Sequence, residues 1–310
     1  MDSIGSVDRE LREKAALVAL LQQPKARWTE ITAEVLEVGS AADVLGTRLD
    51  GENTLFAVDD LPAVIDSAVQ DIRRWEADGI GVHAFYEQRY PAQLRDVHEL
   101  PPILFTRGAL IDDRRAVAVV GTRQASERGL EIARAVAGAL AKNEVTVVSG
   151  LAAGIDTAAH LAALEAHGRT VAVIGTGIRR AYPAANAELQ RRISREGLVL
   201  SQFWPDGAPS QKTFPMRNAV MSGYASATVV IEAAWRSGAR IQARLALQHG
   251  RPVVMPKELL EHDWARDYAG RPGVYVVSDL GEMLRVIDKL VAEATSGLDM
   301  LQEHSGLVQF

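Results

Sequence analysis

Two stretches of the chain, V-G-T-R-Q-A-S-E-R-G at 120–129 and V-V-S-G-L-A-A-G-I-D-T-A-A-H at 147–160, decide the fold. Each begins as an apolar strand, passes through glycine and small polar residues, and continues as a helix. Backbone N–H groups at a helix N-terminus carry partial positive charge, and glycine lets a phosphate approach them closely. The two stretches therefore predict a crevice for a phosphate-bearing ligand, to which Arg123 would add a guanidinium.

The sequence around these two stretches predicts alternating strands and helices from residue 114 onward. The predicted strands are 116–120, 145–149, 170–174, 198–201, 227–232, 252–255 and 274–277. The predicted helices are 127–142, 155–167, 186–196, 216–223, 238–249 and 279–294. Continuous valine-rich runs are typical of parallel strands that are buried on both faces. The pattern predicts an α/β fold, a Rossmann-like, doubly wound, mostly parallel sheet with helices on both faces, which binds ligands beyond the strand carboxyl ends.

The first third of the chain has a helical pattern instead. Its predicted helices are 9–22, 29–38, 40–46 and 60–78, followed by a short strand at 80–85. We therefore divide the chain into a helical N-terminal domain at 1–78, a connecting strand and loop segment at 79–113, and the Rossmann-like domain at 114–294. The tail at 295–310 is polar and has no clear period, so we predict that it is flexible.

The composition is that of an ordinary globular protein, with 310 residues, 47% hydrophobic and 24% charged. The chain has no cysteine, which excludes disulfides, thiolate nucleophiles and zinc–thiolate sites. Its seven histidines show no metal-binding spacing, so no metal or cofactor is expected. The N-terminus does not resemble a signal peptide and no apolar run is long enough for a membrane span, which indicates a cytoplasmic protein with no membrane partner.

The net charge of −6 is distributed unevenly. Residues 1–105 hold most of the acidic excess, whereas 179–217 has seven basic and three acidic side chains. A polyanion could bind this basic segment despite the overall sign. The alternative for Arg191, Arg192 and Arg195 is a solvated helix face.

Other chemistries have weaker signals. The turn after 120 is not G-x-G-x-x-G and no acidic residue closes the next strand, which argues against an NAD enzyme. Asp156 and His160 share a helix face and could orient a general base, but the alternative is a capping Asp156 and a structural His160. Ser149 would offer its hydroxyl to the turn or to a phosphate, because no G-x-S-x-G nucleophile motif is present.

Two further segments indicate nucleic acid. Q-K-T-F-P-M-R-N at 211–218 mixes cations with Phe214 near an extended Phe-Pro joint, a pattern that suits single strands, although Phe214 could equally pack in the core. I-E-A-A-W-R-S-G-A at 231–239 ends a strand in Glu232 and opens another helix at Ser237-Gly238. Glu232 could accept hydrogen bonds from a base or sugar, act as a catalyst, or order a neighbouring arginine.

Taken together, these segments resemble the DNA-processing protein family DprA, also called Smf. The resemblance covers roughly residues 80–256 and is specific because its motifs occur in order. The motifs are Y-P-A-Q-L-R at 90–95, P-P-I-L-F-T-R-G at 101–108, V-V-G-T-R at 119–123, the 147–160 stretch, Y-P-A-A-N at 182–186, F-P-M-R-N at 214–218 and E-A-A-W-R-S-G-A-R-I-Q-A-R-L-A at 232–246.

The resemblance implies a non-enzymatic, dimeric protein that binds single-stranded DNA and loads the recombinase RecA during natural transformation. The residues that it places in a DNA pocket are Arg123, Ser149, Gly150, Lys212, Phe214, Arg217 and Asn218. The glycine turns add the phosphate-binding candidates Gly121, Thr122, Gly154, Ser237 and Gly238, with Asp156 and Glu232 as further ligand-contacting candidates.

This chain departs from the family pattern at two pocket positions. Ala153 and Ala219 stand where the family usually has arginine, and each lost cation weakens phosphate binding. A second hypothesis is therefore a sensor or hydrolase of a nucleotide-derived small molecule, related to the same superfamily. A third is a scaffold whose acidic N-terminal helices bind a partner.

Overall fold

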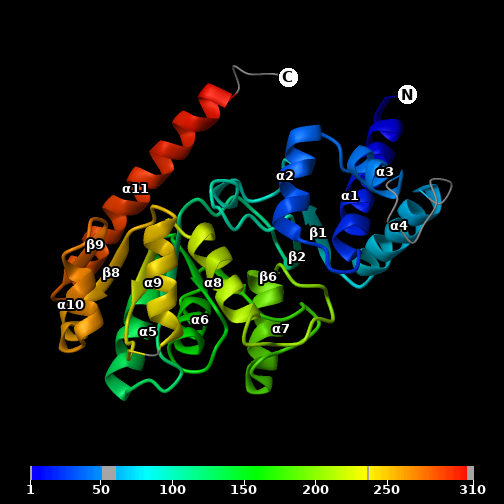
Figure 1. Ribbon diagram of the computed structural model, residues 1–310. Helices are drawn as coiled ribbons and strands as arrows, with labels where there is room; N and C mark the ends of the chain where they lie inside the picture. The colour runs from blue at the N-terminus through cyan, green and yellow to red at the C-terminus, as the bar shows by residue number, and fades with distance from the viewer. Residues whose placement is uncertain (1, 51–60, 236, 306–310) are drawn as a thin grey trace. The chain divides into compact units, whose positions relative to one another are not determined.

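The computed structural model describes residues 2–50, 61–235 and 237–305. The chain forms two compact units, whose elements are labelled in Figure 1. The first comprises Met1–Tyr90 and Leu100–Phe105, and the second comprises Pro91–Glu99 and Thr106–Phe310. Within the described residues, no helix is both long and apolar enough to cross a membrane.

The first unit is mainly helical. Its elements are α1 (Asp2–Gln22), α2 (Trp28–Val38), α3 (Ala41–Asp50), α4 (Leu61–Ala77), β1 (Gly81–Ala84) and the start of β2 (Ile103–Gly108). Helix α1 packs against α3 and α4, and its residues 15–21 are all buried. Trp75 of α4 meets Phe105 edge-on, with ring centroids 5.3 Å apart. The apolar run in α1 therefore forms the centre of this unit.

The second unit is the doubly wound sheet. Its strands are β3 (Ala116–Val120), β4 (Thr146–Ser149), β5 (Thr170–Val173), β6 (Leu198–Ser201), β7 (Ala227–Val230), β8 (Val253–Pro256) and β9 (Val274–Val277). Its helices are α5 (Glu127–Lys142), α6 (Ile155–Glu165), α7 (Ala187–Glu196), α8 (Thr213–Tyr224), α9 (Gly238–Gln248), α10 (Asp263–Ala269) and α11 (Leu280–Ser305). The strand order is β6-β5-β4-β3-β7-β8-β9, and the pairs are parallel.

The strand order reverses beside β3. The chain moves outward from β3 through β4 and β5 to β6, and then returns to pair β7 with the free side of β3. Ligands of such sheets bind beyond the carboxyl ends at this switch point. The topology therefore predicts a ligand site among the residues that follow β3 and β7. The predicted Rossmann-like fold is confirmed.

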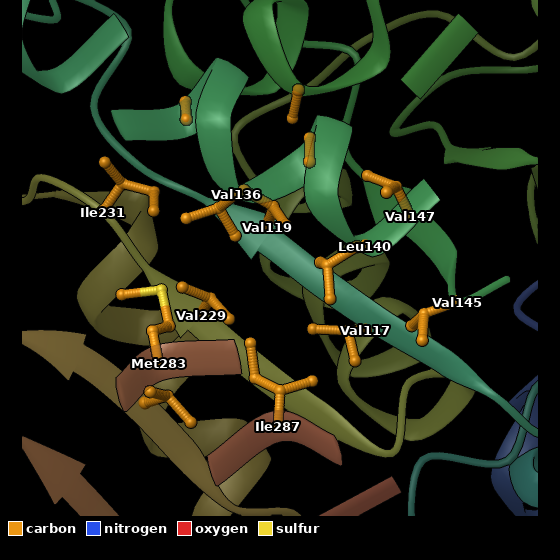
Figure 2. Close-up of a cluster of buried hydrophobic side chains, with 14 of the residues drawn as sticks. Val117, Val119, Val136, Leu140, Val145, Val147, Val229, Ile231, Met283 and Ile287 are labelled. Carbon is orange, nitrogen blue, oxygen red and sulfur yellow. The ribbon is translucent and has the colours of Figure 1, made fainter. Parts of the chain in front are cut away.

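The core beneath the crevice is built from alternating strand residues and two helices. Figure 2 shows Val136 of α5 and Met283 and Ile287 of α11 packing over Val117 and Val229. All of these side chains are buried. Small alanines on α5 and α6 belong to the same cluster, which lets the two helices approach each other closely.

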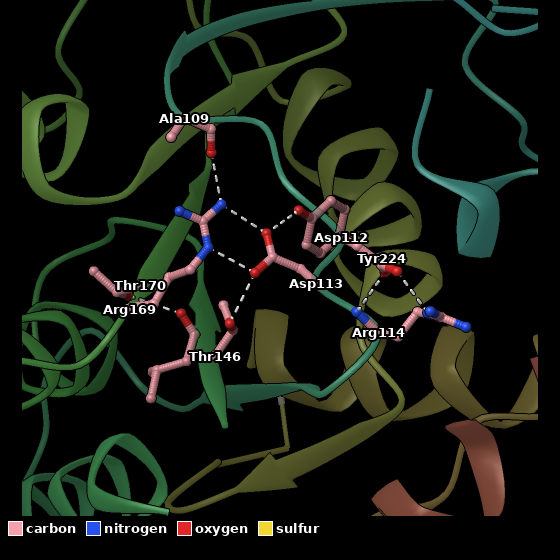
Figure 3. Close-up of polar contacts among 9 residues, drawn as sticks. Ala109, Asp112, Asp113, Arg114, Thr146, Arg169, Thr170 and Tyr224 are labelled. Atoms are coloured by element: carbon pink, nitrogen blue, oxygen red, sulfur yellow. Dashed lines mark hydrogen bonds and ion pairs between the residues drawn. The ribbon is translucent and has the colours of Figure 1, made fainter. Parts of the chain in front are cut away.

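A buried polar network fixes the segment that leads into β3 (Figure 3). Asp113 accepts hydrogen bonds from Arg169 at 2.6 and 2.7 Å, from the Thr146 hydroxyl at 2.8 Å and from the Tyr224 hydroxyl at 2.6 Å. The carboxylate has four charge-assisted bonds and is almost fully buried. This network attaches residues 109–114 to β4, β5 and α8 at the end of the sheet opposite to the crevice.

Four sequence expectations need correction. The connecting segment contains a second strand, β2, and α10 is an additional short helix. The last predicted helix, 279–294, is too short, because α11 extends to Ser305 through residues 292–303, which are mostly good helix formers with no proline. The expected flexibility of 295–310 stays a prediction, and 306–310 lie outside the described residues. The Phe214-Pro215 joint is not extended but lies in the first turn of α8, where a missing N–H costs nothing.

Candidate functional site

A cavity of about 460 Å³ opens at the switch point of the sheet. It lies beyond the end of β3 and is lined by the start of α6, by α8 from Phe214 to Met221, and by the segment from Ala234 to the first turns of α9. We call it the main cavity. Nine of the predicted site residues line it: Gly121, Thr122, Arg123, Asp156, Phe214, Arg217, Asn218, Ser237 and Gly238.

The remaining five predicted residues are not among those that line the main cavity: Ser149, Gly150, Gly154, Lys212 and Glu232. Gly154 begins α6 with φ +79°, and a side chain there would collide with the carbonyl groups of Thr122 and Arg123. Its role is to let the second glycine turn pass close to the first. Lys212 is an exposed cation at the start of α8.

Arg217 and Asp156 bring two buried charges to the cavity. Arg217 is 5% exposed, and its Nη1 donates to the Val173 carbonyl at 3.1 Å. Burial lowers the pKa of Arg217, while the charge of Asp156 acts in the opposite direction. Burial raises the pKa of Asp156, while the charge of Arg217 and the hydrogen bond from the Ala152 N–H lower it. Each charge thus depends on the other for compensation.

Gly150 is required because the Arg217 guanidinium occupies the space where a Cβ would lie. We expect Gly150→Ala to lower the free energy of unfolding by about 1–3 kcal/mol, because the buried arginine must move. The matched control is Gly138→Ala in α5, where a Cβ would meet nothing within 4 Å. That change should be neutral or stabilising. Urea unfolding of both variants checks the expectation, and equal stabilities would contradict it.

A cation and two aromatic rings gather at the rim of the main cavity. The Arg123 guanidinium lies 5.1 Å from the centroid of the Phe214 ring, and the Tyr182 ring lies 5.5 Å from Phe214 at a tilt of 42°. Phe214 is half-buried and packs against the backbone of Gly175, while Tyr182 is 43% exposed. We call these three side chains the stacking platform, since exposed rings and guanidinium planes both accept bases.

Glu232 does not point into the main cavity, which corrects its expected role as a ligand contact. Its carboxylate accepts the N–H of Ser126 at 3.0 Å and the Ser126 hydroxyl at 2.8 Å. Ser126 is the N-cap of α5 and also accepts from Gly129 N–H at 3.0 Å. Glu232 therefore supplies the negative charge at the α5 N-terminus that we expected a phosphate to supply. Arg236, one of the neighbouring arginines that Glu232 was expected to order, lies outside the described residues.

Ser149 and His160 are structural. The Ser149 hydroxyl is fully buried and donates to the Val119 carbonyl at 2.7 Å, so it ties β4 to β3 instead of meeting a phosphate. His160 is fully buried, with Nδ1 2.7 Å from Thr170 Oγ1. Because the Thr170 hydroxyl donates to Val147, its oxygen accepts from a protonated Nδ1. Thr170 thereby fixes the tautomer and orientation of the imidazole, and burial keeps the ring neutral.

The buried His160 should make the fold sensitive to acid. Burial lowers its pKa to about 3, whereas an unfolded histidine titrates near 6.5. Below pH 6.5 the unfolded chain binds a proton at this residue that the folded chain does not bind. The contribution of His160 to the free energy of unfolding is therefore fully present above that pH and is lost as the pH falls towards 3. At pH 5 the loss from this group is about 2 kcal/mol. His160→Gln should remove this part of the pH dependence in urea unfolding, and an unchanged pH dependence would contradict the assignment.

The N-terminus of α9 faces the main cavity through Ser237 and Gly238. The Ser237 side chain caps the helix by accepting from Ala239 N–H, and Asn218 donates to the Gly238 carbonyl at 3.3 Å. Trp264 of α10 holds the preceding segment by donating to the Ala233 carbonyl at 2.9 Å. This helix end is therefore fixed in place from two sides.

The arginines of α7 form ion pairs on their own helix. Arg191 and Arg195 both pair with Glu188, and Arg192 pairs with Glu196 at 3.0 Å. Arg195 is exposed and Arg192 is partly exposed, and neither lines the main cavity, which supports the solvated helix face for these two arginines. At the two departures from the family pattern, Ala153 is exposed next to the cavity-lining Ala152 and Ala219 is buried in α8.

Sequence reasoning missed several residues of the site. Tyr182 belongs to the motif at 182–186, but sequence reasoning assigned it no role in the site. An aromatic residue in a polar loop is itself a sign of a binding surface. Gln124, Met221, Ala234 and Gln242 also line the main cavity. Nothing in their local sequence marks them, because they are brought there by the winding of the sheet.

An open, doubly wound parallel sheet with a cationic and aromatic crevice at its switch point defines a protein of the Rossmann-like class. The chain belongs to the DNA recombination-mediator protein A family, whose model matches residues 81–269. The DNA processing protein DprA of Bacillus subtilis is 30% identical over 245 residues, which is 78% of each chain.

Other relatives match over a smaller part. DprA of Streptococcus pneumoniae is 42% identical over 174 residues, and Protein Smf of Synechocystis is 41% identical over 170. The matches cover 56% and 53% of this chain, but only 61% and 42% of those relatives.

Two solved structures share the fold. The S. pneumoniae DprA structure has a TM-score of 0.65 at 30% identity and covers 89% of this chain and 95% of its own. DprA of Helicobacter pylori has a TM-score of 0.60 at 23% identity, covering 69% of this chain and 96% of its own. That structure is described as showing a single-stranded DNA binding mode of the H. pylori protein.

Proposed function

We propose that this protein binds single-stranded DNA in the main cavity and acts in DNA recombination as a mediator, without catalysing a reaction. The observation that carries the proposal is the stacking platform, which includes Arg123, beside the buried Arg217 at the switch point. Single strands are held by a basic groove that follows the phosphates and by aromatic rings on which bases stack. The main cavity offers both on one rim.

In this proposal the strand's phosphates lie against Arg123 and the N-terminus of α9, and a base stacks on Tyr182. The N-terminus of α5 takes no part, because Glu232 already occupies it. Arg217 contributes its charge from below without leaving its buried position. A non-enzymatic role is supported by the commitment of Ser149, His160 and Glu232 to structural hydrogen bonds.

Family membership extends the proposal to protein partners. Recombinase RecA and a second copy of this chain are the partners that we infer by resemblance, in DNA uptake and natural transformation. Co-sedimentation with RecA and analytical ultracentrifugation test these two partners separately.

A second candidate is a nucleotide-derived small molecule as the ligand. The observation that favours it is the Asp156 carboxylate in the cavity lining, together with alanines at 153 and 219. A carboxylate repels phosphates but accepts hydrogen bonds from a base or a sugar.

Fluorescence polarisation separates the two candidates. Labelled oligo(dT), a duplex of the same length and a panel of mononucleotides are compared at low and high salt. We expect oligo(dT) to bind best and to weaken steeply with salt. No polarisation change with oligo(dT) at micromolar protein in low salt would overturn the DNA proposal, and a nucleotide that raises the melting temperature would support the second candidate.

A further inference from the structure

A second, smaller cavity of about 190 Å³ has a strongly basic lining. It lies among Arg107 of β2, Arg179 of the loop after β5 and Arg191 of α7, together with Gln190 and Ala181. No carboxylate is part of this lining. We call it the arginine cavity. Three guanidinium groups from three separate elements around one small volume favour an anionic ligand.

Two of these arginines have carboxylate partners that a ligand can replace. Arg179 pairs with Asp206 at 2.8 Å and Arg191 with Glu188 at 3.0 Å through its Nε, but both carboxylate side chains are 70% exposed and lie outside the lining. Exposed ion pairs of this kind contribute little free energy. A phosphate in the cavity could therefore take over both guanidinium groups at small cost.

Gln190 adds a second and independent observation. Its side chain is nine-tenths buried, and its amide nitrogen donates to the carbonyls of Ile178 and Arg180 at 3.3 and 3.2 Å. These two bonds fix the orientation of the amide, and its Oε1 is buried without a hydrogen-bond partner. A buried carbonyl oxygen without a donor is unfavourable, so the cavity lacks an N–H group that a ligand could supply.

A nucleotide unit carries both an anionic phosphate for the guanidinium groups and a base with an N–H group for the Gln190 oxygen. We propose that the arginine cavity is a second nucleotide subsite for the same single strand, a proposal that rests on the proposed DNA-binding function. The connection is short, because Ala181 lines the arginine cavity and the next residue, Tyr182, carries a ring of the stacking platform. Consecutive Cα atoms are only about 3.8 Å apart, so the lining of the arginine cavity and the stacking platform share neighbouring residues of one loop.

The test is a length series of oligo(dT) with two double variants. Arg179→Gln with Arg191→Gln removes two charges from the arginine cavity. Arg192→Gln with Arg195→Gln removes two charges from exposed arginines of α7 that lie outside the cavity lining. Because all four side chains are at least partly exposed, both variants should fold.

We expect wild type to bind more tightly once the oligonucleotide is long enough to reach the second subsite. The first double variant should lose that gain, with about tenfold weaker binding of long oligonucleotides and a salt slope lower by about 0.7, the value for one lost phosphate contact. Short oligonucleotides should bind it as they bind wild type, and the control variant should keep the full length dependence.

Three outcomes separate this subsite from the proposed function. Equal losses in both double variants, or none in either, would overturn the second subsite. If Arg123→Ala nevertheless weakens short oligo(dT), the DNA-binding function stands while the second subsite is rejected. If wild type binds no oligonucleotide of any length, both are overturned.

Discussion

Replacing Arg123 and Tyr182 together by alanine should weaken oligo(dT) binding about 100-fold. Each stacked base contributes about 1–3 kcal/mol, and loss of one phosphate contact lowers the salt slope by about 0.7. Arg123 and Tyr182 are both exposed on the rim, so their loss should leave the fold intact. Fluorescence polarisation across a salt series measures both effects.

Two control variants distinguish the loss of the stacking platform from a general loss of charge. Tyr182→Phe keeps the ring and should bind like wild type. Arg134→Ala removes an exposed arginine of α5 that pairs with Glu127 and does not line the main cavity. If Arg134→Ala weakens binding as much as Arg123→Ala does, the interaction depends on overall charge and the platform has no special role.

The second large effect concerns stability. Arg217→Met should lower the free energy of unfolding by about 3–5 kcal/mol, because it leaves the buried Asp156 carboxylate without its compensating charge. The pKa of Asp156, which burial already raises, should rise further. Urea unfolding near neutral pH measures the loss in stability.

A double-mutant cycle identifies the cause. In Arg217→Met with Asp156→Asn, neither buried charge remains, so the double variant should be more stable than Arg217→Met alone. Coupling between neighbouring charges of this kind is about 1–3 kcal/mol. Additive effects of the two changes would show that Arg217 acts only through packing and its hydrogen bond to Val173.

The sequence predicted the second unit well because its signals are local. Valine-rich runs marked all seven of its strands β3–β9, and helical periodicity marked most of the helices between them. The short strand β2 and the helix α10 were missed because each has too few residues to establish a period. The end of α11 was predicted too early because its last residues are polar, although most of them have high helix propensity.

The site was only partly predictable, because its roles depend on partners distant in the chain. Glu232 was expected at the ligand but reaches the Ser126 cap, 106 residues earlier. Ser149 was expected at a phosphate but bonds across strands to Val119. A motif identifies which residues approach the switch point, whereas only the packing decides which side chains face the cavity.

Photocrosslinking tests the central claim most directly. An oligo(dT) in which one thymine is replaced by iodouracil is irradiated with the full-length protein, and the crosslinked peptides are identified by mass spectrometry. The proposal predicts crosslinks at Tyr182 and Phe214, which are lost when excess unlabelled oligo(dT) is added. Crosslinks found only in the helical first unit, with neither ring of the stacking platform labelled, would contradict it.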